Sequence, residues 1–179
     1  MKKYLIIISI LLAFTSNLNK EDKIVVIPDE AIRFRVVAND NSNKSQQTKF
    51  LIKEALEEKL NVLLKNSQSV NETKSILKSN YQTFDNTIKT TLLTNHLTET
   101  YHINYGLNYF PAKKYKGVVY EEGYYESLVI TLGNGNGENW WCVLFPPLCL
   151  MDTETLPKDV EYKSFVQEMI TKYLSSNKK

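Results

Sequence analysis

The spacing of the hydrophobic residues changes once along this 179-residue chain, and that change limits the folds open to it. Between residues 45 and 95 the apolar residues recur at every third or fourth position, the period of an amphipathic helix. From residue 101 to residue 145 they alternate with polar residues or form short runs, as in strands. Because a strand precedes this region and a helix follows it, we predict a single α+β domain with helices layered on a mainly antiparallel sheet.

Local signals place the elements of this domain. Between residues 31 and 38 apolar side chains alternate with Arg33 and Arg35, which predicts the first strand. Ser69 and Glu72 stand three residues apart in a capping-box pattern, which marks the start of a helix. We expect helices over residues 45–66, 69–80 and 83–95, strands from residue 101, between Gly117 and Gly123, over 124–132 and over 140–145, and a closing helix over 157–174 that packs on the sheet.

A glycine-rich stretch, residues 133–137, lies between the last two predicted strands. A phosphate-binding loop is followed by a helix whose N-terminus faces the anion. Here the β-like segment 140–145 follows instead, so we interpret the stretch as a turn that joins the two strands in a hairpin. No cofactor is predicted.

The first residues have the pattern of a targeting segment. Lys2 and Lys3 precede the mostly apolar run YLIIISILLAF, residues 4–14. As a helix this run would be about 17 Å long, well short of the roughly 30 Å hydrocarbon core of a membrane. We therefore predict an export signal over residues 1–16, a linker over 17–30 and the folded domain over 31–179. Cleavage of the signal and its retention as an anchor both stay open.

The charge of the chain is balanced outside that segment. The sequence holds 22 Lys and Arg against 20 Asp and Glu, and Lys2 and Lys3 account for the difference. The remaining 20 basic and 20 acidic residues cancel. A nucleic-acid-binding domain would show a clustered basic face, so this class of protein is not favoured.

Cys142 and Cys149 are the two cysteines of the chain, and export would allow them to pair. Fully extended, the segment between them would separate its ends by roughly 23 Å, whereas a disulfide needs Cα atoms under about 7 Å apart. The chain must therefore reverse, and Pro146 and Pro147 are the natural place. The alternatives are a cysteine nucleophile or a zinc site with His96 or His102, but no spacing marks either one. We predict neither a metal site nor an enzyme.

Trp140 and Trp141 are the unusual side chains of the last strand. Neighbouring residues of a strand point to opposite faces of its sheet, so one tryptophan can enter a helix-covered core while the other lies on the far side. Large aromatic residues are frequent anchors at protein interfaces. Internal packing and contact with a partner both stay open for this segment.

Three stretches resemble one known family. Residues 133–149 (GNGNGENWWCVLFPPLC) are similar to the signature of the stage II sporulation protein R family, a G-x-G-x-G turn followed by NWWCVLFPPLC. Residues 27–40 (IPDEAIRFRVVAND) resemble its upstream stretch IPDEAIRLRVIANSD, and residues 123–128 resemble its G-x-Y-x-A-L element. Ser127 replaces the usual alanine, and the order Asp40-Asn41 departs from the commoner Ser-Asp.

The resemblance implies a function without catalysis. Members of this family are made in the forespore and exported into the space between forespore and mother cell. There they activate a membrane-embedded aspartic protease of the mother cell, which processes the sigma factor precursor.

The alternative function is a secreted cysteine-dependent hydrolase acting on cell-wall material. The candidate partner-binding residues are Arg33, Arg35, Asn39, Asn139, Trp140, Trp141, Phe145, Pro146, Pro147 and Leu148.

Overall fold

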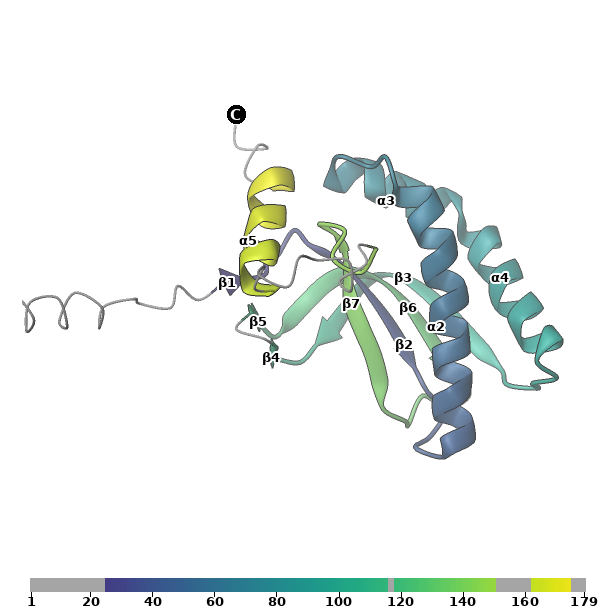
Figure 1. The fold of residues 1–179 in the computed structure, drawn as a ribbon. Helices are drawn as coiled ribbons and strands as arrows, with labels where there is room; N and C mark the ends of the chain where they lie inside the picture. The colour runs from purple at the N-terminus through teal and green to yellow at the C-terminus, as the bar shows by residue number, and fades with distance from the viewer. Residues whose placement is uncertain (1–24, 116–117, 151–161, 175–179) are drawn as a thin grey trace, which may run out of the picture.

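The computed structural model describes residues 25–115, 118–150 and 162–174 (Figure 1). The predicted export signal, most of the predicted linker and the first residues of the predicted closing helix lie outside the described residues. Within the described ranges no helix is long and apolar enough to cross a membrane.

A four-stranded sheet forms the centre of the domain, in the order β3-β6-β2-β7. Its strands are β2 (Ile32–Val37), β3 (Tyr101–Phe110), β6 (Gly123–Leu132) and β7 (Asn139–Phe145). The central pair, β2 and β6, is parallel, and both outer pairs are antiparallel. The predicted α+β class with a mainly antiparallel sheet is confirmed.

The predicted hairpin between β6 and β7 is wrong, because β2 lies between them. Ile32, Phe34 and Val36 of β2 are all fully buried, which favours a central position in the sheet over an edge. The glycine-rich turn therefore passes around the end of β2, where Gly137 N donates to Ala38 O at 2.9 Å. The turn and strand signals in the sequence located both strands correctly. They did not predict that each of the two strands pairs with β2, which lies far away in the sequence.

A second, three-stranded sheet has the order β1-β5-β4, formed by β1 (Val25–Val26), β5 (Val118–Tyr120) and β4 (Lys113–Tyr115). β1 lies in the segment predicted as linker. It pairs parallel with β5, and the Ile27 amide extends the pairing by donating to Val119 O at 3.0 Å. Ile27 is buried, so residues 25–27 belong to the folded domain because they supply apolar surface to it.

Three helices cover one face of the large sheet: α2 (Asn43–Leu64), α3 (Val70–Ser79) and α4 (Tyr81–Thr94). The predicted helix start is confirmed: Ser69 is the N-cap, and Glu72 N donates to its Oγ at 3.1 Å. The Glu72 carboxylate reaches one residue beyond the cap, where Oε2 accepts from Gln68 N at 2.9 Å. The buried side of α2 repeats every fourth residue through Ile52, Leu56, Leu60 and Leu64, whereas Phe50 and Leu51, which the spacing had placed on the apolar face, are exposed. Burying one such side chain stabilises the fold by roughly 1.5–3 kcal/mol.

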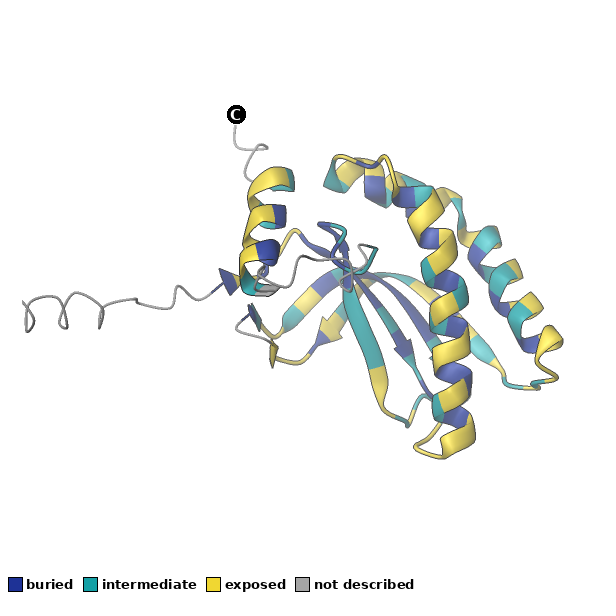
Figure 2. Ribbon diagram, viewed as in Figure 1, coloured by how far each residue is buried: buried dark blue, intermediate teal, exposed yellow. Residues whose placement is uncertain are grey.

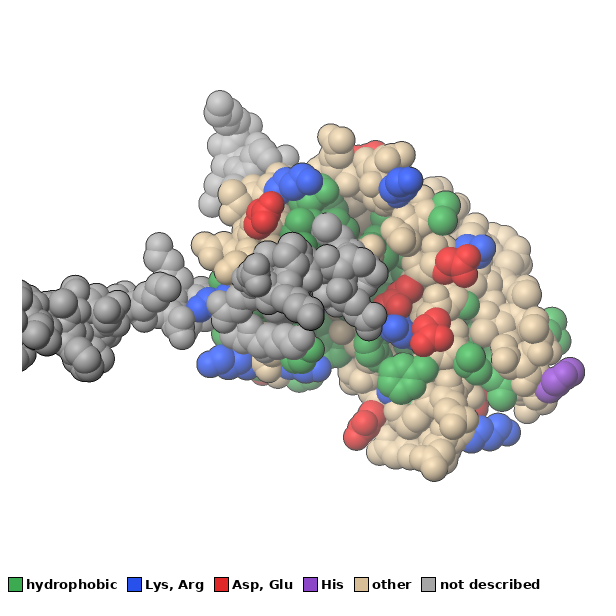
Figure 3. Space-filling view, in the orientation of Figure 1, with side chains coloured by type: hydrophobic (Ala, Val, Ile, Leu, Met, Phe, Trp, Pro, Cys, Tyr) green, Lys and Arg blue, Asp and Glu red, His purple; other side chains and the backbone are tan. Residues whose placement is uncertain are grey.

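The exposure pattern separates an inner and an outer side of these helices. In Figure 2 the buried positions of α2 and α4 form stripes toward the sheet, and the exposed positions lie outward. On the face drawn in Figure 3, acidic and basic side chains are interspersed over the helices and form no extended patch of one sign among the described residues.

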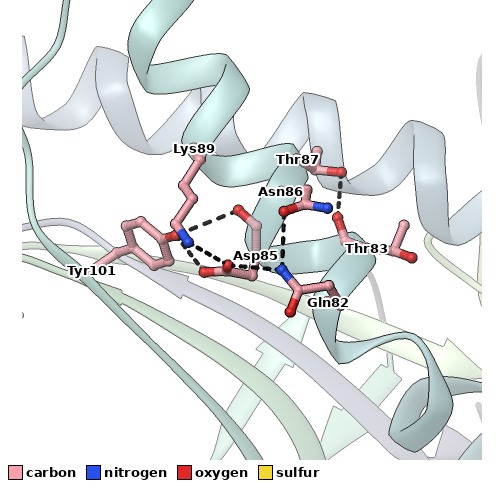
Figure 4. A network of polar contacts seen from close by, with 7 residues as sticks. All are labelled: Gln82, Thr83, Asp85, Asn86, Thr87, Lys89 and Tyr101. Atoms are coloured by element: carbon pink, nitrogen blue, oxygen red, sulfur yellow. Dashed lines mark hydrogen bonds and ion pairs between the residues drawn. The ribbon is translucent and has the colours of Figure 1, made fainter.

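A polar network fastens α4 to the edge strand β3 (Figure 4). The Tyr101 hydroxyl donates to Asp85 Oδ1 at 2.5 Å, and Lys89 Nζ lies 2.7 Å from Asp85 Oδ2. These two contacts hold the pKa of the Asp85 carboxyl below its usual value, because both favour the charged form. Burial and the nearby carboxylate raise the pKa of Tyr101, so its hydroxyl keeps its proton and acts as a donor.

Helix α5 (Tyr162–Tyr173) closes the domain by packing against β1. Its buried residues Phe165, Val166 and Met169 join a second apolar cluster with the small sheet and with Val143 of β7. Tyr173 also reaches Phe145, with ring centroids 5.5 Å apart. The closing helix was predicted to pack on the sheet, and its described part packs on the small sheet and the β7 end of the large one.

Candidate partner-binding site

The first two resembling stretches form one structural unit, a clasp between residues 38–41 and 133–138. Asn39 Oδ1 accepts from Asn134 N at 2.8 Å, and Asn41 Oδ1 accepts from Glu138 N at 2.7 Å. Asn39 O accepts from Asn136 N at 2.9 Å. Asn39 therefore holds the turn by which the chain enters β7, and these contacts account for its place in the motif.

Two of the turn's glycines are required by close approach. A Cβ on Gly133, whose φ is +52°, would lie 2.3 Å from Asn39 Oδ1. A Cβ on Gly137 would lie 2.3 Å from the carbonyl oxygen of Asp40. The glycines that first suggest a phosphate loop thus let the turn approach the Asn39 side chain and the Asp40 backbone closely.

Lys49 of α2 supports the same unit from the helix side. Its Nζ donates to Glu138 O at 3.1 Å and to Gln46 Oε1 at 2.6 Å, and the side chain is buried. Burial lowers the pKa of this ammonium group. Lys49 was not predicted from the sequence, because a lysine among the charged residues of a helix gives no sign of a buried position.

Arg33 and Arg35 lie on the face of the large sheet opposite α2, α3 and α4. Arg33 is fully buried, and its guanidinium carbon stands 3.4 Å from the centroid of the Tyr125 ring. Phe110 and Trp141 lie beside it, at 5.1 and 5.3 Å. Such cation–π contacts hold a guanidinium group without an acidic partner. Arg33 is therefore enclosed within the domain and is not positioned to contact a partner.

Arg35 is less enclosed. Its Nη1 donates to Tyr109 O at 3.1 Å, and its guanidinium carbon lies 4.6 Å from the Phe110 ring centroid. Arg33 Nη2 donates in turn to Glu121 O at 3.5 Å. Burial lowers the pKa of both guanidinium groups, because it disfavours their charged forms.

The aromatic partners of these arginines come from the tyrosine-rich part of the chain. Tyr125 and Phe110 flank Arg33, and Tyr120 packs edge-on against Trp141, with ring centroids 5.0 Å apart. The density of tyrosines between residues 101 and 125 was a signal for this cluster. It could not be assigned a role before the sheet brought the rings around a cation.

Ser127, which departs from the family pattern, lies in the same layer. It is fully buried, and its hydroxyl accepts from Asn108 Nδ2 at 3.0 Å and donates to Tyr125 O at 3.2 Å. A buried hydroxyl is costly only when it has no hydrogen-bond partner. Asn108 therefore accommodates the serine at a position that is usually alanine.

The two tryptophans lie on opposite faces of β7, as the pleat predicted. Trp140 contacts Phe34 on the helix-covered side, with centroids 5.7 Å apart, and Lys53 Nζ stands 5.0 Å from its ring. Trp141 packs on Phe110 on the other side, with centroids 5.6 Å apart. Both side chains are half-buried, so each combines internal packing with an accessible portion.

The segment after β7 is a tight reversal. Cys142 and Cys149 form a disulfide with Cα atoms 5.8 Å apart, as predicted, and the peptide bond between Phe145 and Pro146 is cis. Cys149 N donates to Val143 O at 3.1 Å. Of the remaining candidates here, Phe145, Pro146 and Leu148 are buried, Pro147 is half-buried, and Asn139 at the other end of β7 is exposed.

The structure does not assemble the cysteine–histidine pair that a hydrolase would need. His102 lies on β3, and β6 and β2 separate that strand from β7. Three strand spacings amount to roughly 14 Å. Both cysteines are in the disulfide, and within the described ranges no three His, Cys, Asp or Glu side chains gather as a metal site.

These features define the class of the molecule: an α+β domain whose motif residues build a disulfide-closed edge strand with a tryptophan on each face. The sequence model of the family described as Stage II sporulation protein R (spore_II_R) matches residues 28–155. Stage II sporulation protein R from Bacillus subtilis (strain 168) is 39% identical over 132 residues. The chain belongs to the stage II sporulation protein R family.

The match to this relative covers 74% of the present chain and 59% of the relative, which is less than two thirds of its length. No solved structure matches the chain.

Proposed function

We propose that this chain is an exported signalling protein of sporulation that acts by contact with a membrane protein. The observation that carries the proposal is the architecture of β7. The residues that resemble the family signature build one edge strand, and each face of that strand carries a partly exposed tryptophan. Partly exposed tryptophans on a rigid element are suited to anchoring a partner.

The partner that we propose is the membrane-embedded aspartic protease of the mother cell. The chain would be made in the forespore and exported into the space between the two cells. Contact would activate the protease, which would then process the precursor of the mother-cell sigma factor. The family membership supports this sequence of events, and the apolar run at residues 4–14 behind Lys2 and Lys3 supports export.

A contact function also agrees with the chemistry of the site. The motif residues are engaged in packing, in the clasp and in a disulfide. Each of these interactions fixes the shape of the surface around β7, which is what recognition of another protein requires. We place this contact surface on the extracytoplasmic side, where the predicted export signal would deliver it.

Co-expression in a non-sporulating bacterium tests this function. The chain, directed to the extracytoplasmic side by its own N-terminus, is combined with the candidate protease and the sigma precursor. We expect cleavage of the precursor only when all three proteins are present. A variant that lacks residues 1–16 should leave the precursor intact, because it is not delivered. Cleavage without the chain, or by the chain without the protease, would overturn the proposal.

A further inference from the structure

The outer edge of β7 carries backbone groups that point away from the sheet. Glu138 O accepts from Ala38 N, so residue 138 faces β2, and the alternation of an antiparallel pair then turns Asn139, Trp141 and Val143 outward. The Val143 carbonyl does point outward, because it accepts from Cys149 N. Of the described residues, none but Cys149 hydrogen-bonds to this edge through the backbone.

The disulfide loop ends this open edge. Cys149 occupies the Val143 carbonyl and is tied to Cys142, so an added strand could pair along residues 139–143 and no further. An unpaired edge is a ready template for pairing with another chain unless it is covered. The position of the loop leaves a short, defined length of edge with both tryptophans along it.

The two sides of the edge differ in charge. On the Trp140 side, Lys53 is neutralised by Glu57, whose Oε2 lies 2.8 Å from Lys53 Nζ. On the Trp141 side, Lys113 Nζ stands 5.3 Å from the indole ring, and Arg35 is the cross-strand neighbour of Trp141. Neither Lys113 nor Arg35 forms an ion pair within the described part of the chain. The Trp141 side is therefore cationic, whereas the charges beside Trp140 cancel.

We propose that the outer edge of β7 is the docking strand for an extended segment of a partner protein, which adds to the sheet antiparallel or parallel along residues 139–143. Because side chains of an added strand alternate, the segment carries acidic residues on the side of Trp141 and uncharged residues on the side of Trp140. This inference rests on the proposed function, since it names the surface through which the signalling partner is recognised.

The other edge of the sheet is a poorer template. On β3 the Ile103 and Tyr109 carbonyls already accept from the Tyr81 hydroxyl and from Arg35 Nη1, at 3.4 and 3.1 Å. Leu107 is nevertheless 72% exposed there, which makes β3 the natural comparison in an experiment.

Backbone-directed substitution in the co-expression system tests the proposal. Asn139→Pro removes an outward N–H and adds a ring at the edge, while the hydrogen bonds to β2 are retained. We expect precursor cleavage about tenfold slower with Asn139→Pro than with Asn139→Ala, which keeps the N–H. Lys113→Glu should slow cleavage about fivefold at low salt, with the difference shrinking as salt rises, because the attraction is screened. Lys114→Glu, an exposed neighbour on the other side of β4, serves as the matched charge control.

A photo-crosslinking residue at position 139, compared with a second variant that carries it at position 107, gives a readout that is independent of cleavage. Each variant is first checked for an unchanged unfolding temperature. A crosslink from position 139 to the co-expressed protease supports the proposal. Equal rates for Asn139→Pro and Asn139→Ala, a crosslink from 139 to a second copy of the chain or within the chain, or a protease crosslink from 107 alone would overturn it. If the unaltered chain triggers no cleavage but 139 still crosslinks to the protease, the activation mechanism fails and the docking edge stands.

Discussion

Gly137→Ala gives a direct test of the clasp that sets the entry to β7. The added Cβ would lie 2.3 Å from Asp40 O and 2.6 Å from Asp40 C, both backbone atoms that cannot rotate away. The backbone must therefore separate. Three hydrogen bonds lie in the path of that movement: Gly137 N to Ala38 O, Asn136 N to Asn39 O, and Glu138 N to Asn41 Oδ1. At about 1 kcal/mol each, their loss lowers the free energy of unfolding by about 2–3 kcal/mol.

The chain offers a matched control in Gly106→Ala. Gly106 also lies on the large sheet, but the nearest atom to its added Cβ is Asn104 Oδ1 at 3.9 Å, an ordinary contact. Alanine also restricts the unfolded chain more than glycine does. We expect Gly106→Ala to change the free energy of unfolding by less than about 0.5 kcal/mol or to raise it slightly.

Urea denaturation of the two purified variants beside the unaltered protein measures both effects. For a domain of this size the loss in Gly137→Ala corresponds to a fall in unfolding temperature of about 5–10 °C. A Gly137→Ala protein within about 1 kcal/mol of the unaltered protein would refute the clasp argument. Equal destabilisation by both substitutions would refute it too, because the cause would then be general to glycine.

Three further predictions concern the disulfide, the α4 network and the tryptophans. Replacing Cys142 and Cys149 together by serine should lower the free energy of unfolding by about 2.5 kcal/mol, the value for so short a loop. Precursor cleavage should persist as long as the protein stays folded. Complete loss of cleavage in a folded variant would favour the alternative in which a cysteine thiol takes part in catalysis. The pKa of Asp85 is lowered in the folded state, so its stabilising contribution is present above pH 3.8 and is lost as the pH falls through the lower folded value. Asp85→Asn should therefore reduce the free energy of unfolding by about 1 kcal/mol at pH 7 and make it less dependent on pH below pH 3.8. A urea midpoint equal to that of the unaltered protein, both at pH 7 and below pH 3.8, would contradict this. Trp140→Ala and Trp141→Ala should each lower signalling and cost less than the roughly 3–5 kcal/mol of a fully buried aromatic, because both are half-buried; signalling losses that merely follow unfolding would assign these side chains to the core alone.

The sequence by itself determined the elements and their faces. The period of the apolar residues located α2, α3, α4 and the long strands, because periodicity depends on neighbours within one or two turns or pleats. The same local geometry placed Trp140 and Trp141 on opposite faces of β7 before any partner strand was known. The disulfide between Cys142 and Cys149 was predicted from the cysteine pair and the export signal, and the extended length of the segment between them required the chain to reverse there.

Only the tertiary structure decided which strands pair and which charged residues are enclosed. β2 lies between β6 and β7 because a strand buried through Phe34 and its neighbours is stabilised most at the centre of the sheet, and this depends on residues 94 to 113 positions away. Arg33 has the sequence pattern of a solvent-facing strand residue, yet it is fully buried, because Phe110, Tyr125 and Trp141 arrive from three different strands to enclose it. The order of the strands and the burial of Arg33 depend on contacts between residues that are far apart in the sequence, so the local spacing of residues does not predict them.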